Sequence, residues 1–210
     1  MIITPGLAKI EGFIKIFNPE TGEVFVDKKN AIHYENMSVS LAQSLSDAVS
    51  PSNNSGLGRI YEMAFGNGGS AVDPTGVITY LPPNIIGQNA DLYNETYYKV
   101  VDQNSASNLD PANNYMTVLH TSGNVYTDIL VTCLLDYGEP AGQQAFDNSA
   151  NYNGEFVFDE LGLKTWQGTA NDLSLITHVI FHPVQKSLNR QIQIDYTLRI
   201  QTLTNLSTSA

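Results

Sequence analysis

The sequence has few charged residues and even fewer basic ones. Its 210 residues include 10 Lys and Arg against 21 Asp and Glu, so only 15% are charged and the formal net charge is −11. Soluble domains carry about 25% charged residues on average. Ten cations are too few to line a phosphate-binding surface, which excludes a general nucleic-acid-binding protein. The hydrophobic fraction of 42% excludes a disordered acidic tail, because it can supply the core of one domain.

Cysteine and long apolar segments are also scarce. Cys133 is the only cysteine, so the chain has no disulfide framework of its own. It lies in the apolar stretch of residues 128–136, where we expect a buried thiol rather than a reactive one. That stretch is far shorter than the ~20 residues that cross a bilayer, and the first residues do not have the pattern of a signal peptide. These absences predict a protein made in a reducing cytoplasm, with no membrane partner.

The alternation of apolar and polar residues that is typical of β-strands is present in many segments. It is clearest over residues 191–203, where one face would carry Ile192, Ile194, Tyr196, Leu198 and Ile200. The other expected strands are residues 9–17, 24–26, 59–65, 77–80, 96–101, 115–120, 125–135, 155–161 and 173–181.

One helix is expected, over residues 36–49. Met37, Leu41, Leu45 and Val49 recur every four residues and would form its apolar face, with Asn36 as the N-cap.

Together these elements predict a mainly β protein, an antiparallel β-sandwich or jelly-roll-like body with one short N-terminal helix and long loops. We expect residues 1–57 to form an arm, a hairpin and the helix packed on the body. Residues 58–203 would form the sandwich, and residues 204–210 a polar tail.

Three intervals between the expected strands are long, at residues 82–95, 102–113 and 137–154. They are poor in charge and contain apolar and aromatic side chains, so they pack either on a neighbouring subunit or back on their own sandwich. The candidate assembly contacts in and near these loops are Phe65, Asn67, Asp73, Ile85, Ile86, Tyr93, Phe146 and Tyr152.

Motifs that could support chemistry are weak. Residues 66–70 (GNGGS) follow a strand but lack the Lys of a phosphate loop, so we expect a surface loop whose glycines adopt positive φ. His178 and His182 share one strand face about 13 Å apart, too far for a single metal ion. Residues 149–160 approach the spacing of a calcium loop but lack most of its carboxylates.

Four acids, Asp136, Glu139, Asp159 and Glu160, could supply the pair of carboxylates that glycoside hydrolysis requires. They could equally be solvated ends of loops and strands. The sequence therefore predicts no catalytic residues, no cofactor and no metal site.

Three short segments resemble those of tailed-bacteriophage virion structural proteins. Residues 60–70 (IYEMAFGNGGS) resemble their opening strand and glycine turn, and residues 154–164 (GEFVFDELGLK) resemble a later strand. Residues 175–184 (LITHVIFHPV), with the alternating segment that follows, resemble their closing hairpin. The resemblance covers about residues 58–203.

This resemblance implies a non-enzymatic, self-assembling subunit of a phage virion, put together in the host cytoplasm. Its partners would be copies of itself and other virion proteins, with no sequence-specific nucleic acid. The expected place is the neck or tail apparatus, with capsid decoration as the alternative. A different class, a carbohydrate-binding β-sandwich, is indicated by 11 tyrosines, Trp166 and the Asn-rich loops.

Overall fold

The computed structural model describes residues 7–140 and 155–203, which are mainly strands with a single α-helix, as predicted. The elements are β1 (Leu7–Phe17), β2 (Val24–Ile32), α1 (Tyr34–Leu45), β3 (Ile60–Gly66), β4 (Ser70–Val72), β5 (Ile78–Tyr80), β6 (Glu95–Val100), β7 (Tyr115–Leu119), β8 (Tyr126–Leu135), β9 (Glu155–Thr169), β10 (Asp172–Leu175), β11 (Thr177–Ser187) and β12 (Ile192–Leu203).

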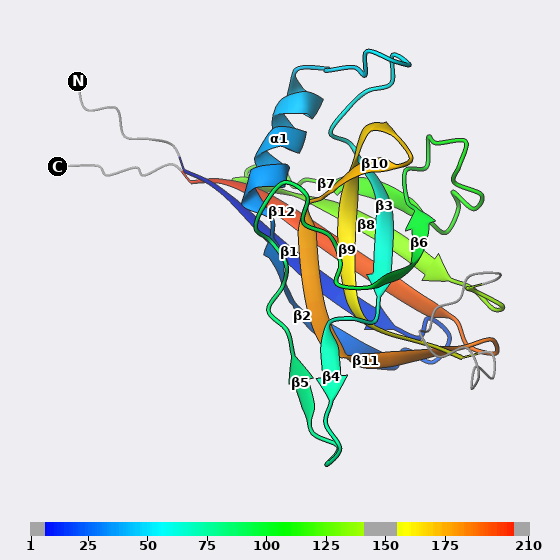
Figure 1. Cartoon of the computed structure of the whole chain (residues 1–210). Coiled ribbons are helices and arrows are strands. Elements are labelled where there is room, and N and C mark those ends of the chain that lie inside the picture. Colours follow the sequence, from blue (N-terminus) through cyan, green and yellow to red (C-terminus); the bar gives the residue numbers. More distant parts are fainter. Residues whose placement is uncertain (1–6, 141–154, 204–210) are drawn as a thin grey trace.

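Ten of the strands form one antiparallel sheet, in the order β6-β3-β9-β11-β2-β1-β12-β8-β7, with β10 paired to β9 beside this path. The sheet curls so that its strands surround a common interior, which gives the sandwich-like body that the alternation predicts (Figure 1). The hairpin β1–β2 lies in the middle of this order, between β11 and β12, and is therefore part of the body rather than an attachment to it. A second, two-stranded sheet of β4 and β5 projects from the body (Figure 1).

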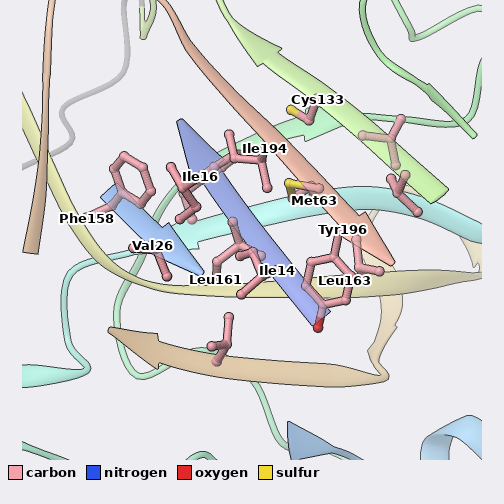
Figure 2. Close-up of a cluster of buried hydrophobic side chains, with 14 of the residues drawn as sticks. Ile14, Ile16, Val26, Met63, Cys133, Phe158, Leu161, Leu163, Ile194 and Tyr196 are labelled. Carbon is pink, nitrogen blue, oxygen red and sulfur yellow. The ribbon is translucent and has the colours of Figure 1, made fainter. Parts of the chain in front are cut away.

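The core is formed by alternate residues of the curled sheet. In β12 the side chains of Ile192, Ile194, Tyr196 and Leu198 are buried, as the alternation predicts, while Ile200 is partly exposed. Figure 2 shows one cluster of buried side chains from β1, β3, β8, β9 and β12, which includes Ile14, Ile16, Met63, Cys133, Phe158 and Ile194. The thiol of Cys133 is fully buried, and this burial raises its pKa to about 12. The expectation of an unreactive buried cysteine is confirmed.

The helix is shorter than predicted at its C-terminal end and begins earlier. His33, rather than Asn36, is the N-cap, because its Nδ1 accepts the backbone N–H of Asn36 at 3.2 Å. Asp47 has a φ of 51°, a left-handed conformation that follows the end of the helix at Leu45. Only the first part of the predicted apolar face is therefore covered, and Leu45 and Val49 are exposed. No helix in the described residues is long and apolar enough to cross a membrane.

The predicted strand over residues 173–181 is in fact two strands, β10 and β11. The second continues past Pro183 to Ser187, because its register with β9 shifts between Ile180 and Val184. Such a bulge accommodates a proline, which cannot donate to the ladder. On its other side β11 pairs with β2 only at Thr177 and His178, and a cleft of about 430 Å³ separates the two strands beyond that point.

Candidate functional site

Two neighbouring carboxylates on β9 organise the surface from which the β4–β5 hairpin projects. Asp159 is buried, and it accepts the backbone N–H groups of Gly69 at 2.9 Å and Ser70 at 2.8 Å, together with the Ser70 hydroxyl. These donors stand at the point where the chain enters β4, so Asp159 fixes one strand of the hairpin at its base.

Glu160 joins the turn after β3 to the segment before β6. Its Oε1 accepts the N–H groups of Gly68 at 3.0 Å and Asn94 at 2.8 Å, and its Oε2 accepts that of Tyr93 at 2.9 Å. The Nε2 of His178 lies 3.0 Å from the same Oε2. A single fully buried carboxylate thus connects β3, β6, β9 and β11.

The hydrogen bonds of His178 determine its tautomer. Its Nδ1 accepts the backbone N–H of Asn84 at 2.8 Å, so the ring proton lies on Nε2, where it is donated to Glu160. His178 therefore also holds the loop that follows β5. His182 is exposed, and its Nδ1 lies 3.2 Å from the hydroxyl of Tyr80 on β5.

The pKa values of the two carboxyl groups are shifted in opposite directions because the groups differ in hydrogen bonding. Burial raises the pKa of Asp159, and the hydrogen bonds from Ser70 and Gly69 offset this only in part. Burial also acts to raise the pKa of Glu160, but the hydrogen bonds from His178, Asn94, Tyr93 and Gly68 outweigh it, so this pKa lies below its usual value. Glu160 is thus stabilised as a carboxylate.

The glycine turn of residues 66–70 serves this centre, which corrects the expectation of a surface loop. Gly66, Gly68 and Gly69 do not have positive φ, and Gly66 and Gly69 are buried. A Cβ on Gly66 would lie 2.5 Å from both the Asn94 carbonyl oxygen and Glu160 Oε1. Glycine is required here for close approach rather than for backbone conformation. The turn presents its N–H groups to anions, as a phosphate loop does, but the anions are the chain's own carboxylates.

Beyond this base, the β4–β5 hairpin exposes several apolar side chains. Figure 1 shows the hairpin extending away from the curled sheet. At its tip the carboxylate of Asp73 accepts the N–H groups of Thr75 and Val77, a turn that also lowers the Asp73 pKa. The exposed apolar residues on the hairpin and the loop after it are Val72, Val77, Tyr80, Leu81 and Ile86.

The structure separates the predicted contact residues into distinct groups. Phe65 is fully buried and packs edge-on against Phe158, so its side chain is not on the surface. Asp73 lies at the hairpin tip, and Ile86 is 87% exposed. Tyr93 is exposed, and Asn67 and Ile85 are half-buried. Phe146 and Tyr152 lie outside the described residues.

Val77 and Tyr80, which the structure exposes beside Val72 and Leu81, are not among the contact residues that the sequence predicts. The sequence does not predict that these side chains are exposed, because a short apolar strand has the same residue pattern whether it is buried or projects from the body. The two carboxylates of the centre were among the acids singled out, but their backbone donors lie 66 to 92 positions earlier in the chain and His178 lies 18 positions later.

The remaining candidates have structural partners. The carboxylate of Glu160 is occupied by three backbone N–H groups, and residues 149–154 of the calcium-like spacing lie outside the described residues. In the part of the chain that the structure describes, no group of three His, Cys, Asp or Glu residues could hold a metal ion. Glu139 forms an ion pair with Lys99 at 2.7 Å and accepts the N–H of Asp136.

Trp166 does not form an open aromatic platform. Its ring lies 4.6 Å from that of Tyr61 and 5.4 Å from the Arg59 guanidinium, and its Nε1 donates to the Ser55 hydroxyl. Comparisons with protein-family models, with curated proteins and with solved structures find no match for this chain.

Proposed function

We propose that this protein is a non-enzymatic structural subunit that assembles with copies of itself through the β4–β5 hairpin and the loop that follows it. The observation that supports this most directly is the group of exposed apolar side chains on a projecting hairpin, from Val72 to Ile86. Contiguous exposed apolar surface is typical of a protein interface.

The construction of the hairpin supports the same proposal. A two-stranded hairpin is marginally stable by itself, and this one is held at its base by Asp159, by the hydrogen bond from Leu81 N to Gly69 O and by the contact of Tyr80 with His182. The protein therefore fixes the direction of an element whose tip exposes the side chains of Val72 and Val77. A neighbouring subunit would cover Val72 and Val77 at the tip.

The composition agrees with a subunit that is covered by its neighbours. With 15% charged residues, few ions have to be desolvated when two surfaces come together. We further propose that the particle is a phage virion, with the neck or tail apparatus as the place of the subunit. This rests on the resemblance of residues 58–203 to virion proteins.

The assembly proposal is tested by two lysine substitutions at the hairpin tip, Val72→Lys together with Val77→Lys. Each would bury an uncompensated charge at the contact, which costs about 2 kcal/mol or more at an interface centre. We expect wild-type protein to form oligomers in sedimentation-velocity experiments and the double variant to sediment as a monomer at the same concentration.

A matched control carries the same two lysines at exposed leucines elsewhere, Leu45→Lys together with Leu109→Lys, and it should keep the wild-type mass. A wild-type chain that stays monomeric at high concentration, or a hairpin variant that assembles normally, would contradict the proposal. The mass of the oligomer also distinguishes the two positions in a virion, because a neck or tail part would form rings of six or twelve and a decoration protein would form trimers.

A further inference from the structure

A second cleft, separate from the hairpin, lies over β3, β6 and β9. Its volume is about 410 Å³, within the range of small-molecule sites. Met63 and Phe65 of β3 belong to the core, so Glu62, which alternates with them, faces away from the core and into this cleft. The side chains that matter for its chemistry are those of Tyr61, Glu62, Asp91, Glu95, Tyr98 and Lys164.

Glu62 is a buried acid without a partner. Its register neighbours are Val100 on β6 and Lys164 on β9, and the residue is 5% exposed. The ammonium of Lys164 instead forms ion pairs with Asp91, at 2.8 Å, and with Glu95. Among the described residues no hydrogen bond or ion pair reaches the Glu62 carboxyl group. The carboxyl oxygens are not among the fully buried atoms that lack a partner, so they reach the open cleft, where a ligand can supply the partner.

The charges around Glu62 favour a positively charged ligand. The cleft holds one cation, Lys164, against Asp91 and Glu95, so it has an excess of negative charge before Glu62 is counted. Burial raises the pKa of Glu62 to about 7; the charge of Lys164 lowers it and those of Glu95 and Asp91 raise it further. A nearby cation would therefore favour the ionised form of Glu62.

An exposed tyrosine lines the cleft together with these acids. Tyr98 is 46% exposed, whereas the ring of Tyr61 is buried and packs against Trp166. Tyrosine rings next to carboxylates are suited to organic cations, which the negative face of the ring attracts.

We propose that this cleft binds an organic cation, an alkylammonium or guanidinium group, with Glu62 as its hydrogen-bonding counter-ion and Tyr98 against its alkyl part. The excess negative charge disfavours an anion, and among the described residues no group of three His, Cys, Asp or Glu side chains could hold a metal ion here. A neutral saccharide would leave the charge of the cleft uncompensated. The cation has two possible sources, a small amine or a lysine side chain of another protein.

The test is calorimetric titration of the full chain with butylammonium chloride and with Nα-acetyl-lysine methylamide. Methyl α-glucoside serves as the neutral comparison. We expect both cations to bind and the glucoside not to bind. Tighter binding of the lysine derivative would indicate a protein side chain as the source, and equal binding a small amine; either outcome supports the proposal.

The substitution Glu62→Gln keeps the shape of the side chain and removes its charge. It should weaken cation binding about tenfold to a hundredfold, the usual effect of losing a hydrogen bond to a charged group. Glu23→Gln, at an exposed position outside the cleft, should leave the affinity unchanged. Circular dichroism would verify that both variants are folded. Cations that bind Glu62→Gln as tightly as wild type, binding of the glucoside alone, or no cation binding at all would overturn the proposal.

A pH series gives a second readout that a purely structural role would not produce. The charged groups that face Glu62 are Lys164 on β9, Glu95 on β6 and Asp91 in the loop before it. Because the cation favours ionised Glu62, wild-type affinity should fall about tenfold between pH 8 and pH 6. The Glu62→Gln variant should show no such fall. The test does not depend on assembly, since it can be repeated with the hairpin variant.

Discussion

Three buried carboxyl groups on two adjacent strands illustrate how neighbouring atoms determine the protonation of an acid. Glu160 accepts three backbone N–H groups and is kept ionised, Asp159 is compensated only in part, and Glu62 has no hydrogen-bond donor among the described residues. All three acids lie on the paired strands β3 and β9. The difference between their pKa values therefore arises from the hydrogen-bond donors that the fold brings to each carboxyl group.

The raised pKa of Glu62 predicts a specific dependence of stability on pH. Its pKa in the folded chain is about 7, against an ordinary value of 4.5, so between these values the unfolded chain loses the proton and the folded chain keeps it. The stabilising contribution of the protonated form is complete below about pH 4.5 and is lost as the pH rises through 7. Glu62→Gln should therefore raise the free energy of unfolding by about 3 kcal/mol at pH 8 and leave it nearly unchanged at pH 4.

Urea denaturation of wild type and Glu62→Gln from pH 4 to pH 8 measures this difference directly. Glu23→Gln, at an exposed position outside the cleft, is the control for the substitution itself. If the free energies of unfolding of Glu62→Gln and wild type differed by the same amount at every pH, the pKa of Glu62 would not be raised in the folded chain, and the prediction would be wrong.

At the scale of the elements, the side chain of Glu160 joins three segments of the chain that are far apart in the sequence. The turn after β3, the segment before β6, and β11 through His178 all meet at this carboxylate. The direction of the β4–β5 hairpin depends on that junction, since the hairpin begins within two residues of Gly68.

We predict that Glu160→Gln loosens this junction and lowers overall stability by about 2–3 kcal/mol. The neutral amide can accept with one oxygen only and turns an N–H group toward backbone donors, which leaves buried groups unsatisfied. Hydrogen–deuterium exchange should increase at residues 66–70 and 91–95, while exchange in β1 and β12 should change only as much as global stability does. If exchange at these two segments increased no more than exchange in β1 and β12, the role assigned to Glu160 would be wrong.

At the scale of the whole molecule, the net charge of −11 would oppose the self-association that we propose for the hairpin. Copies of an acidic subunit repel one another, and this repulsion acts over distances that salt screens. The proposed apolar contact at Val72 and Val77 would act only at short range and would not weaken with moderate salt.

Assembly should therefore become stronger as the salt concentration rises. Between 50 mM and 500 mM NaCl we expect the fraction of oligomer at a fixed protein concentration to increase in sedimentation-velocity experiments. An interface built from ion pairs would behave in the opposite way, so dissociation at high salt would be incompatible with the proposed hairpin contact.

Much of the fold was predictable because the alternation of apolar and polar residues is a local property of the chain. The buried face of β12, the hairpin turn between β1 and β2, and the burial of Cys133 all follow from residues that are close together in the sequence. The helix was predicted with errors at both ends, because the capping of Asn36 by His33 and the left-handed Asp47 depend on local geometry that propensity does not fix.

The sequence by itself determined that the chain is a mainly β domain with an acidic surface poor in charge, because composition and period-two patterning act locally. The tertiary structure alone decided that β1 and β2 lie in the centre of the sheet, and that a glycine turn encloses Asp159 and Glu160. It also decided that Glu62 is buried in a cleft without a donor. Those outcomes depend on strand pairings between residues tens of positions apart, and no local pattern encodes which distant donor reaches which acid.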